Sequence, residues 1–185
     1  MRFSLSFGRE RFGLSRKLLA ALVLALALPA VGSVSALREH RLRFYHTHTG
    51  ERLDIVYRVG DAYLPDALEK LNVYLRDHRT GDVVPYDPRV FDVLDELLAS
   101  VHKEGSEIDV ICGYRTPWSN ELLRARSSGV ASHSLHMQAQ AIDIRVPGVA
   151  TDRLRDAALA LHRGGVGFYA KSNFVHVDVG RVRRW

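Results

Sequence analysis

The alternation of polar and apolar residues first becomes regular at Arg41. From Arg41 to Tyr45, and again from Arg52 to Tyr57, polar residues alternate with apolar or aromatic ones, which is the period of a β-strand that buries one face. The segment from His46 to Gly50 lies between them, is polar and ends in glycine, a composition typical of turns. The pattern therefore predicts two strands joined as a β-hairpin.

The spacing of apolar residues then changes to that of α-helices. Two segments place apolar residues three or four positions apart, and a proline stands near the start of each, where a helix tolerates it. The first segment contains Leu64, Leu68, Leu71 and Leu75 around Pro65, and the second contains Phe91, Leu94 and Leu98 after Pro88. Residues 81–88 lie between these helices and hold two prolines, so we expect a loop there within a single domain.

Shorter strands and helices are expected in the rest of the chain. The pattern predicts strands over residues 107–112, 141–146, 166–169 and 174–179, and helices over residues 118–127 and 151–162. Thr151 is the expected N-cap of the last helix, and Gly164 and Gly165 are expected to end it. Residues 132–140 show no apolar period and are predicted as a loop. This order predicts an α+β fold with a small, mainly antiparallel sheet flanked by helices.

Residues 1–36 have the layout of an export signal. Basic residues precede an apolar run from Leu18 to Ala30, and Val34, Ser35 and Ala36 offer a cleavage site. The run is shorter than the roughly 20 residues of a membrane-spanning helix, so we expect cleavage rather than an uncleaved anchor. The predicted organisation is a signal peptide, residues 1–36, and one domain, residues 37–185. That domain is expected in the periplasm or cell envelope, without stable membrane insertion after cleavage.

Charge and cysteine content exclude further classes. Residues 1–36 hold five of the 26 Lys and Arg residues and one of the 21 Asp and Glu residues, so the formal net charge falls from +5 to +1 when they are removed. Nucleic acid is therefore not an expected partner, because no strongly basic surface remains. Cys112 is the only cysteine, which excludes an internal disulfide. Its strand-like surroundings favour a small buried side chain over a thiol nucleophile. The expected assembly is a monomer.

Candidate chemistry is concentrated at His136, Asp143 and His176. His136 and Asp143 are seven positions apart, which is roughly 10 Å along a helix and roughly 23 Å along a strand. Ligands of one zinc ion lie far closer, since each bond is only about 2 Å long. If both residues bind one ion, the chain must fold back between them, and residues 137–140 are the expected turn.

The strand period assigns each candidate to a face of the sheet. In residues 141–146 the apolar positions are 142, 144 and 146, so Asp143 points to the opposite side. In residues 174–179 the valines alternate in the same way, so His176 and Asp178 share the other face. Two histidines and one carboxylate can hold zinc and leave a fourth position for water. A buried histidine bonded to an aspartate without any metal is the alternative that these residues leave open.

Several motifs give this pattern a context. Residues 134–143, with the sequence SLHMQAQAID, resemble the Ser-x-His-x-x-Gly-x-Ala-x-Asp signature of the D-alanyl-D-alanine metallopeptidases. Further stretches resemble the branch of that group that contains murein endopeptidase K, namely residues 113–115, 124–131, 164–169 and 172–178. The resemblance covers nearly all of residues 37–185. Several separate stretches in the same order are more specific than one short motif.

The resemblance implies a zinc metallopeptidase that acts on peptidoglycan stem peptides. One zinc ion per chain would be held by His136, Asp143 and His176, and a zinc-activated water would hydrolyse an amide bond.

The resemblance also implies that Arg115 lies at the site. There it would steady a developing oxyanion or hold a substrate carboxylate, and a surface ion pair is the alternative. Tyr114 and His133 are further candidates for substrate contact. For His133, a solvent-exposed ring is the alternative.

Two positions depart from the pattern of the group. Ala139 stands where the signature has glycine, so a positive φ there would strain the turn by about 1 kcal/mol. Asn173 stands three positions before His176, where many members of the wider group carry an acidic residue, and an amide cannot accept a proton. Asp178 is then the candidate general base, with hydrogen bonding to a metal ligand as its alternative role.

Other conspicuous residues receive simpler interpretations. His46 and His48 are attributed to an exposed polar turn. Trp118 is expected to pack at a helix start, with stacking on substrate as the alternative. The basic residues 181–185 are expected to be a solvated chain end, with contact to anionic wall polymer as the alternative.

Three functions remain open on the sequence. The leading hypothesis is a murein endopeptidase that cuts either the D-Ala to diaminopimelate or the diaminopimelate to diaminopimelate cross-link. A D,D-carboxypeptidase of the same group would use the same metal chemistry but would differ in whether the cleft is open at both ends. The third is a non-catalytic, zinc-containing domain that binds peptidoglycan, which Asn173 would favour.

Overall fold

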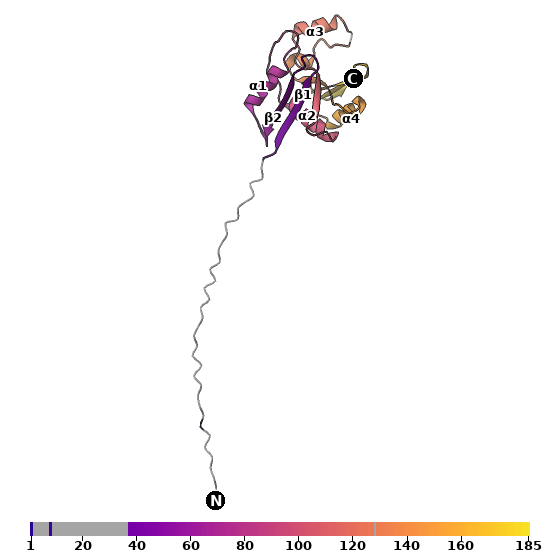
Figure 1. The fold of residues 1–185 in the computed structure, drawn as a ribbon. Helices are drawn as coiled ribbons and strands as arrows, with labels where there is room; N and C mark the ends of the chain where they lie inside the picture. Colours follow the sequence, from indigo (N-terminus) through magenta and orange to yellow (C-terminus); the bar gives the residue numbers. More distant parts are fainter. Residues whose placement is uncertain (2–7, 9–36, 128) are drawn as a thin grey trace. The chain divides into compact units, whose positions relative to one another are not determined.

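An eight-stranded mixed β-sheet organises the fold in the computed structural model (Figure 1). The strands are β1 (Glu39–His46), β2 (Arg52–Val59), β3 (Ala62–Tyr63), β4 (Glu107–Cys112), β5 (Ala141–Arg145), β6 (Gly165–Tyr169), β7 (Phe174–Asp178) and β8 (Arg183–Arg184). Their order across the sheet is β3-β2-β1-β4-β5-β7-β6-β8. The β1–β4 and β6–β8 pairs are parallel and the other neighbouring pairs are antiparallel. The predicted hairpin and the mainly antiparallel sheet are confirmed.

The structure describes residues 1, 8, 37–127 and 129–185. The predicted signal peptide, apart from residues 1 and 8, lies outside the described residues. Within the described part, no helix combines the length and apolar character that crossing a bilayer requires.

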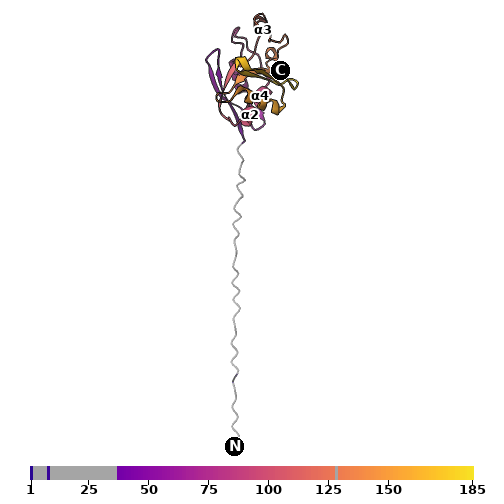
Figure 2. The same cartoon turned by 90° about the vertical axis from the view of Figure 1, so that its right-hand side faces the viewer.

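Four α-helices of the described part surround the sheet. They are α1 (Pro65–Tyr74), α2 (Arg89–Ser100), α3 (Pro117–Arg124) and α4 (Thr151–Leu161). Helices α2 and α4 pack against each other, and both contact β7. Figures 1 and 2 show α3 at the opposite end of this part of the chain from α2 and α4. These helices and the mixed sheet confirm the predicted α+β class.

The hydrophobic core explains why the strands have two unlike faces. Ile142 and Ile144 of β5 and Val175 and Val177 of β7 are buried in one cluster with residues of α2 and α4. Alternate residues of the same strands must point to the other side of the sheet. The burial of these aliphatic rows therefore fixes the direction of the polar residues between them.

The start and end of α4 differ from the prediction. The helix is preceded by Ala150, which has no side-chain cap, and the Thr151 hydroxyl instead contacts the Asn173 side chain. The helix ends at His162, which adopts a left-handed conformation (φ +52°). Gly164 has another role, because a Cβ there would overlap the backbone carbonyl of Asp178. Thr151 and Gly164 thus make long-range contacts with residues 173 and 178 in place of the local roles that the sequence suggested.

Candidate metal centre

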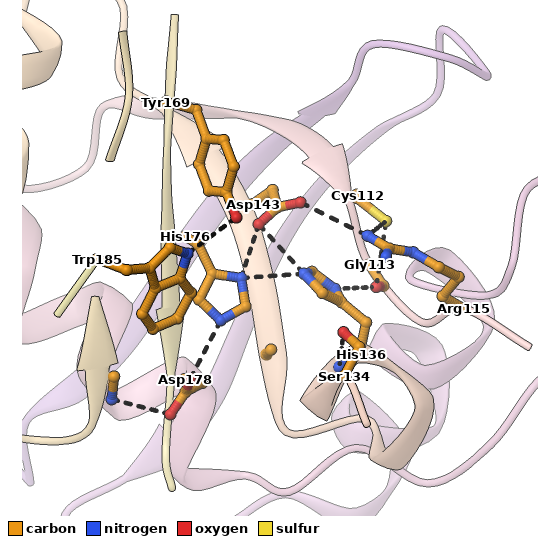
Figure 3. A network of polar contacts seen from close by, with 12 residues as sticks. Cys112, Gly113, Arg115, Ser134, His136, Asp143, Tyr169, His176, Asp178 and Trp185 are labelled. Carbon is orange, nitrogen blue, oxygen red and sulfur yellow. Dashed lines mark hydrogen bonds and ion pairs between the residues drawn. The ribbon is translucent and has the colours of Figure 1, made fainter. Parts of the chain in front are cut away.

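Three predicted metal ligands meet on one face of the sheet (Figure 3). Asp143 of β5 and His176 of β7 are directly opposite in the antiparallel register. His136 approaches them from a short 3₁₀-helix, η1 (Leu135–Gln138). His136 Nε2 lies 3.1 Å from Asp143 Oδ1 and 3.1 Å from His176 Nδ1, and the last two atoms are 2.9 Å apart. Tetrahedral bonds to zinc would separate such atoms by roughly 3.3 Å, so the donor set fits this ion.

The chain reversal between His136 and Asp143 occurs where it was predicted. Residue Ala139 ends η1 in a left-handed conformation with φ +51°. The Gln140 amide then donates to the Leu135 carbonyl at 3.1 Å, which closes the turn before β5 begins. The glycine position of the signature therefore has a positive φ in this chain, where alanine occupies it.

Hydrogen bonds assign one free nitrogen to each histidine. His136 Nδ1 lies 2.8 Å from the Gly113 carbonyl oxygen, so Nδ1 carries a hydrogen and Nε2 is the nitrogen that faces Asp143 and His176. His176 Nε2 lies 3.1 Å from Asp178 Oδ2, which leaves Nδ1 as the free nitrogen. These two nitrogens are the ones that face each other and Asp143. Partners of this kind orient metal-binding histidines in many proteins.

The carboxylate of Asp178 accepts several hydrogen bonds from fixed partners. It accepts them from the Gly165 and Gly180 amides at 2.8 and 2.9 Å and from Arg183 at 3.1 and 2.7 Å. Burial alone would raise the pKa of Asp178, but the bonds from His176 and Arg183 hold it well below its ordinary range. A carboxylate held in this way accepts protons poorly. Its contacts match the second of its two predicted roles, the orientation of His176.

Arg115 lies at the site, as the resemblance implied, and not in a surface ion pair. The residue is 7% exposed. Its Nη2 is 3.8 Å from Asp143 Oδ2 and 3.5 Å from Cys112 Sγ, and its Nη1 donates to Asn120 Oδ1 at 3.1 Å. The guanidinium therefore lies beside Oδ2 of Asp143, whereas the two histidines contact Oδ1.

Cys112 has a closer relation to the site than the sequence indicated. It is buried, as predicted, but its sulfur, His136 and Asp143 form a second set of donor atoms within 4.8 Å of one another. Burial alone would raise the pKa of the thiol, but His136 and Arg115 lower it below its ordinary value. The His176 set is tighter, with all three distances at 3.1 Å or less, and its lone pairs converge.

The charge balance at the site favours a cation. Burial alone would lower the pKa of His136, but the Asp143 carboxylate raises it to about 10. Burial alone would raise the pKa of Asp143, but the two histidines hold it well below its ordinary value. The carboxylate thus draws positive charge to the point where the three donor atoms meet.

A cleft of about 770 Å³ opens onto the three donors. Its lining includes Tyr169, Arg183 and Trp185 from the last strands of the chain, and His48, His78 and Arg79 from the segments that follow β1 and α1. His133 also lines it and is exposed. Tyr114 does not line the cleft but is buried in the hydrophobic core, so the structure separates this predicted substrate contact from the site.

Asn173 does not occupy the cleft either. Its side chain is exposed and contacts the Thr151 hydroxyl on α4, while its neighbours Ser172 and Phe174 line the cleft. The backbone at Asn173 is left-handed, with φ +53°. The residue at this position therefore turns away from the donor set.

Two interpretations of conspicuous residues were wrong, those of His46 and Trp118. His46 is buried, and its ring lies 5.9 Å from that of His78. His48 is exposed in the turn, as expected, and stacks on His78 at 4.2 Å. Trp118 is 61% exposed and does not pack at its helix start. The last residues are mostly exposed, as expected of a chain end, but β8 also pairs with β6, and Trp185 lies 5.1 Å from the His176 ring. The contacts of His46 and of β8 join segments far apart in sequence, for which no local pattern exists.

Comparisons with known proteins place the chain in a family. A protein-family model described as "Peptidoglycan L,D-endopeptidase MepK" matches residues 34–185. The protein of that name from Escherichia coli K12 is 37% identical over 182 residues, which cover 95% of this chain and 100% of the relative. The "Probable peptidoglycan L,D-endopeptidase MepK" of Haemophilus influenzae is 40% identical over 152 residues, or 82% of each chain. The resemblance detected in the sequence is confirmed, and the chain belongs to the peptidoglycan L,D-endopeptidase MepK family.

Proposed function

We propose that this protein is a zinc-dependent endopeptidase that hydrolyses peptide cross-links of peptidoglycan. The observation that carries the proposal is the convergence of His136 Nε2, Asp143 Oδ1 and His176 Nδ1 within 2.9–3.1 Å of one another. When bound there, zinc would supply a Lewis acid and lower the pKa of a water molecule toward neutrality. Family membership supports the substrate class.

The protein's own residues have separate tasks in this proposal. Gly113 and Asp178 hold the tautomers of the two histidines, so that each presents a lone pair to the ion. Arg115 orients Asp143 and offsets the negative charge that the site gathers during hydrolysis. Asp178 acts here as a positioning residue and not as the general base, because its oxygens already accept five hydrogen bonds from Gly165, Gly180, Arg183 and His176.

The cleft supports an endopeptidase over a carboxypeptidase. Its walls come from the β1 side of the sheet, at His48, and from the β8 side, at Trp185. The donor set on β5 and β7 lies between these strands in the sheet order. A substrate chain that continues on both sides of the scissile bond can therefore contact residues of the cleft on either side of the donor set.

The relatives suggest which cross-link is cut. They are named L,D-endopeptidases, and of the two candidate cross-links only the one between two diaminopimelate residues joins an L centre to a D centre. We propose that bond as the substrate. Asn173 lies outside the cleft and contacts Thr151, so the residue at this position has no task in the proposed reaction.

The remaining parts of the proposal concern the chain as a whole. We propose that residues 1–36 are a cleaved signal peptide, that residues 37–185 form a single monomeric domain, and that the domain acts in the periplasm or cell envelope. The amino-terminal sequence of the protein recovered from the envelope tests this point, since it should begin close after Ala36.

The test of function is product release from cross-linked sacculi by residues 37–185. Wild type, wild type with a chelator, and a His136→Ala variant are compared. We expect cross-linked dimers to fall to monomers only with untreated wild type, and the products identify the bond. Dimers that persist while the protein binds both zinc and sacculi would contradict the enzyme and favour the binding domain.

A further inference from the structure

Tyr169 lies at the end of β6, beside the three donors, and has no task in the proposed function. It pairs with Phe174 across the sheet, and its ring stacks on that of Phe174 with 4.5 Å between centroids and 17° between planes. Figure 3 shows its hydroxyl directed toward the group formed by His136, Asp143 and His176. The stacked ring therefore holds a phenol at the wall of the cleft, next to the site of reaction.

The hydroxyl of Tyr169 has one fixed partner, and that partner is a donor. Trp185 Nε1 donates to the Tyr169 oxygen at 2.9 Å. An indole N–H can only donate, so this bond uses a lone pair of the oxygen and leaves the phenolic hydrogen free. Among the described residues, none accepts a hydrogen bond from Tyr169 at hydrogen-bonding distance. The phenol is thus a donor held in the cleft without an acceptor.

The indole that holds this phenol is itself fixed in place. The Trp185 amide donates to the Val166 carbonyl at 3.2 Å, and the Trp185 carbonyl accepts from Phe168 at 3.1 Å. The indole lies so close over Gly167 that a Cβ there would be 2.7 Å from it. On its other side the ring lies 5.1 Å from the ring of His176. The indole, although half exposed, is therefore in contact with both the phenol and the ring of His176.

The other candidate donor near the site has its terminal nitrogens engaged. Arg115 is buried and places Nη1 and Nη2 beside Asn120, Cys112 and Asp143, while its Nε has no hydrogen-bond partner among the described residues. A transition-state oxyanion is best stabilised by donors that point at it beforehand and do not have to give up another partner. The phenolic hydrogen of Tyr169 meets this condition, and the terminal nitrogens of Arg115 do not.

We propose that Tyr169 is a catalytic residue that donates a hydrogen bond to the scissile carbonyl oxygen as it becomes an oxyanion. Trp185 is the positioning residue that directs the phenolic hydrogen into the cleft. The inference rests on the proposed peptidase function. No covalent bond to Tyr169 forms or breaks, and its proton stays on the phenol throughout.

The test compares Tyr169→Phe with wild type, with Trp185→Phe, and with Tyr45→Phe as the matched control. Tyr45 lies on β1 outside the cleft, with Arg52 over its ring, so the control removes the same atom elsewhere. kcat and KM are measured on a soluble cross-linked muropeptide, and bound zinc and thermal stability are measured on each variant. We expect Tyr169→Phe to lower kcat by about 10²–10³-fold, with KM, zinc and stability near wild type. Trp185→Phe should lower kcat less, and Tyr45→Phe should not.

Three results would overturn this role. They are a Tyr169→Phe kcat within about twofold of wild type, a change in KM alone, or a loss of zinc that accounts for the loss of rate. In each of these cases an active wild type leaves the proposed function standing. A wild type that releases no product under any condition would overturn the proposed function, and this inference with it.

Discussion

Two groups of histidines lie at or beside the same cleft, and their chemistry is opposite. The metal group, His136 and His176, shares the Asp143 carboxylate, which raises the pKa of His136 to about 10. The turn group, His46, His48 and His78, has no carboxylate bonded to its rings in the described part of the chain, and burial and Arg79 lower the pKa of His78 to about 4. The surroundings of the metal group therefore stabilise positive charge, and those of the turn group destabilise it. The number of histidines therefore does not define a metal centre.

The orientation of the rings differs in the same way. Each histidine of the metal group has one nitrogen fixed by Gly113 or Asp178, which turns the other nitrogen toward the shared point. In the turn group, His48 and His78 stack in parallel with 7° between planes. His46 Nε2 is buried without a hydrogen-bond partner among the described residues. The turn group therefore lacks both a shared carboxylate and an acceptor that orients each ring.

The strongest challenge to this comparison replaces one histidine in each group. We expect His136→Ala to lose zinc on dialysis and to lower peptidase activity by at least about 10³-fold, because a bound metal supplies several kcal/mol of transition-state stabilisation. His78→Ala should retain one zinc per chain. Metal content by atomic absorption after dialysis, with the rate of muropeptide release, measures both. Equal loss of zinc from the two variants would mean that the turn group contributes a ligand.

A smaller effect is expected when an orienting group is changed instead of a ligand. Asp178→Asn keeps the shape but weakens the acceptor that fixes His176, so zinc affinity should fall by about 10–100-fold. Asp109→Asn is the control, since Asp109 pairs with Arg145 at 3.0 Å and does not contact a histidine. Competition with a zinc-binding dye gives both affinities. Unchanged affinity in Asp178→Asn would show that the ligands alone organise the site.

Much of the metal group follows from strand periodicity. Because β5 and β7 bury one aliphatic row each, the alternation of residues along the chain is enough to assign the faces of Asp143, His176 and Asp178. A reversal near Ala139 is required because seven residues of regular helix or strand would hold His136 and Asp143 too far apart to share one ion. These inferences depend only on neighbours along the chain.

The turn group and the last strand could not be predicted in this way. His78 reaches His48 from the segment after α1, thirty positions away, and β8 reaches β6 by a parallel pairing with no hairpin signal. Trp185 and Tyr169 meet only because of that pairing. Long-range contacts of this kind leave no period in the sequence.

A smaller effect, on the stability of the fold, is expected at Asp77, which links the segment of the turn group to Thr116. Asp77, next to His78, accepts hydrogen bonds from the Thr116 amide and hydroxyl at 2.8 and 2.9 Å and from the Arg79 amide at 2.9 Å. Burial alone would raise the pKa of Asp77, but these bonds lower it below its ordinary value. Asp77→Asn should reduce the free energy of unfolding at pH 7 by about 1–3 kcal/mol, since buried donors lose an acceptor.

The direction of the pKa shift at Asp77 determines how this stability difference changes with pH. A carboxyl group whose folded-state pKa is depressed stabilises the fold above its unfolded pKa of about 4 and loses that contribution as the pH falls below it. The difference between wild type and Asp77→Asn in urea unfolding should therefore be largest near neutrality and shrink in acid. A difference that stays constant with pH would assign the effect to shape and not to charge.

The smallest effect is expected at Ala139, where the metal group departs from the signature of its relatives. Glycine would relieve the strain of a left-handed residue, about 1–2 kcal/mol. The same change removes a fully buried methyl group, worth about 0.8 kcal/mol, and gives the unfolded chain more freedom, worth about 0.4–1 kcal/mol. Because these terms nearly cancel, Ala139→Gly should shift the thermal midpoint by no more than about 4 °C and leave zinc affinity unchanged. A large gain in stability would mean that burial of the methyl group contributes little, and a loss of zinc would mean that the methyl group itself keeps His136 in reach of Asp143.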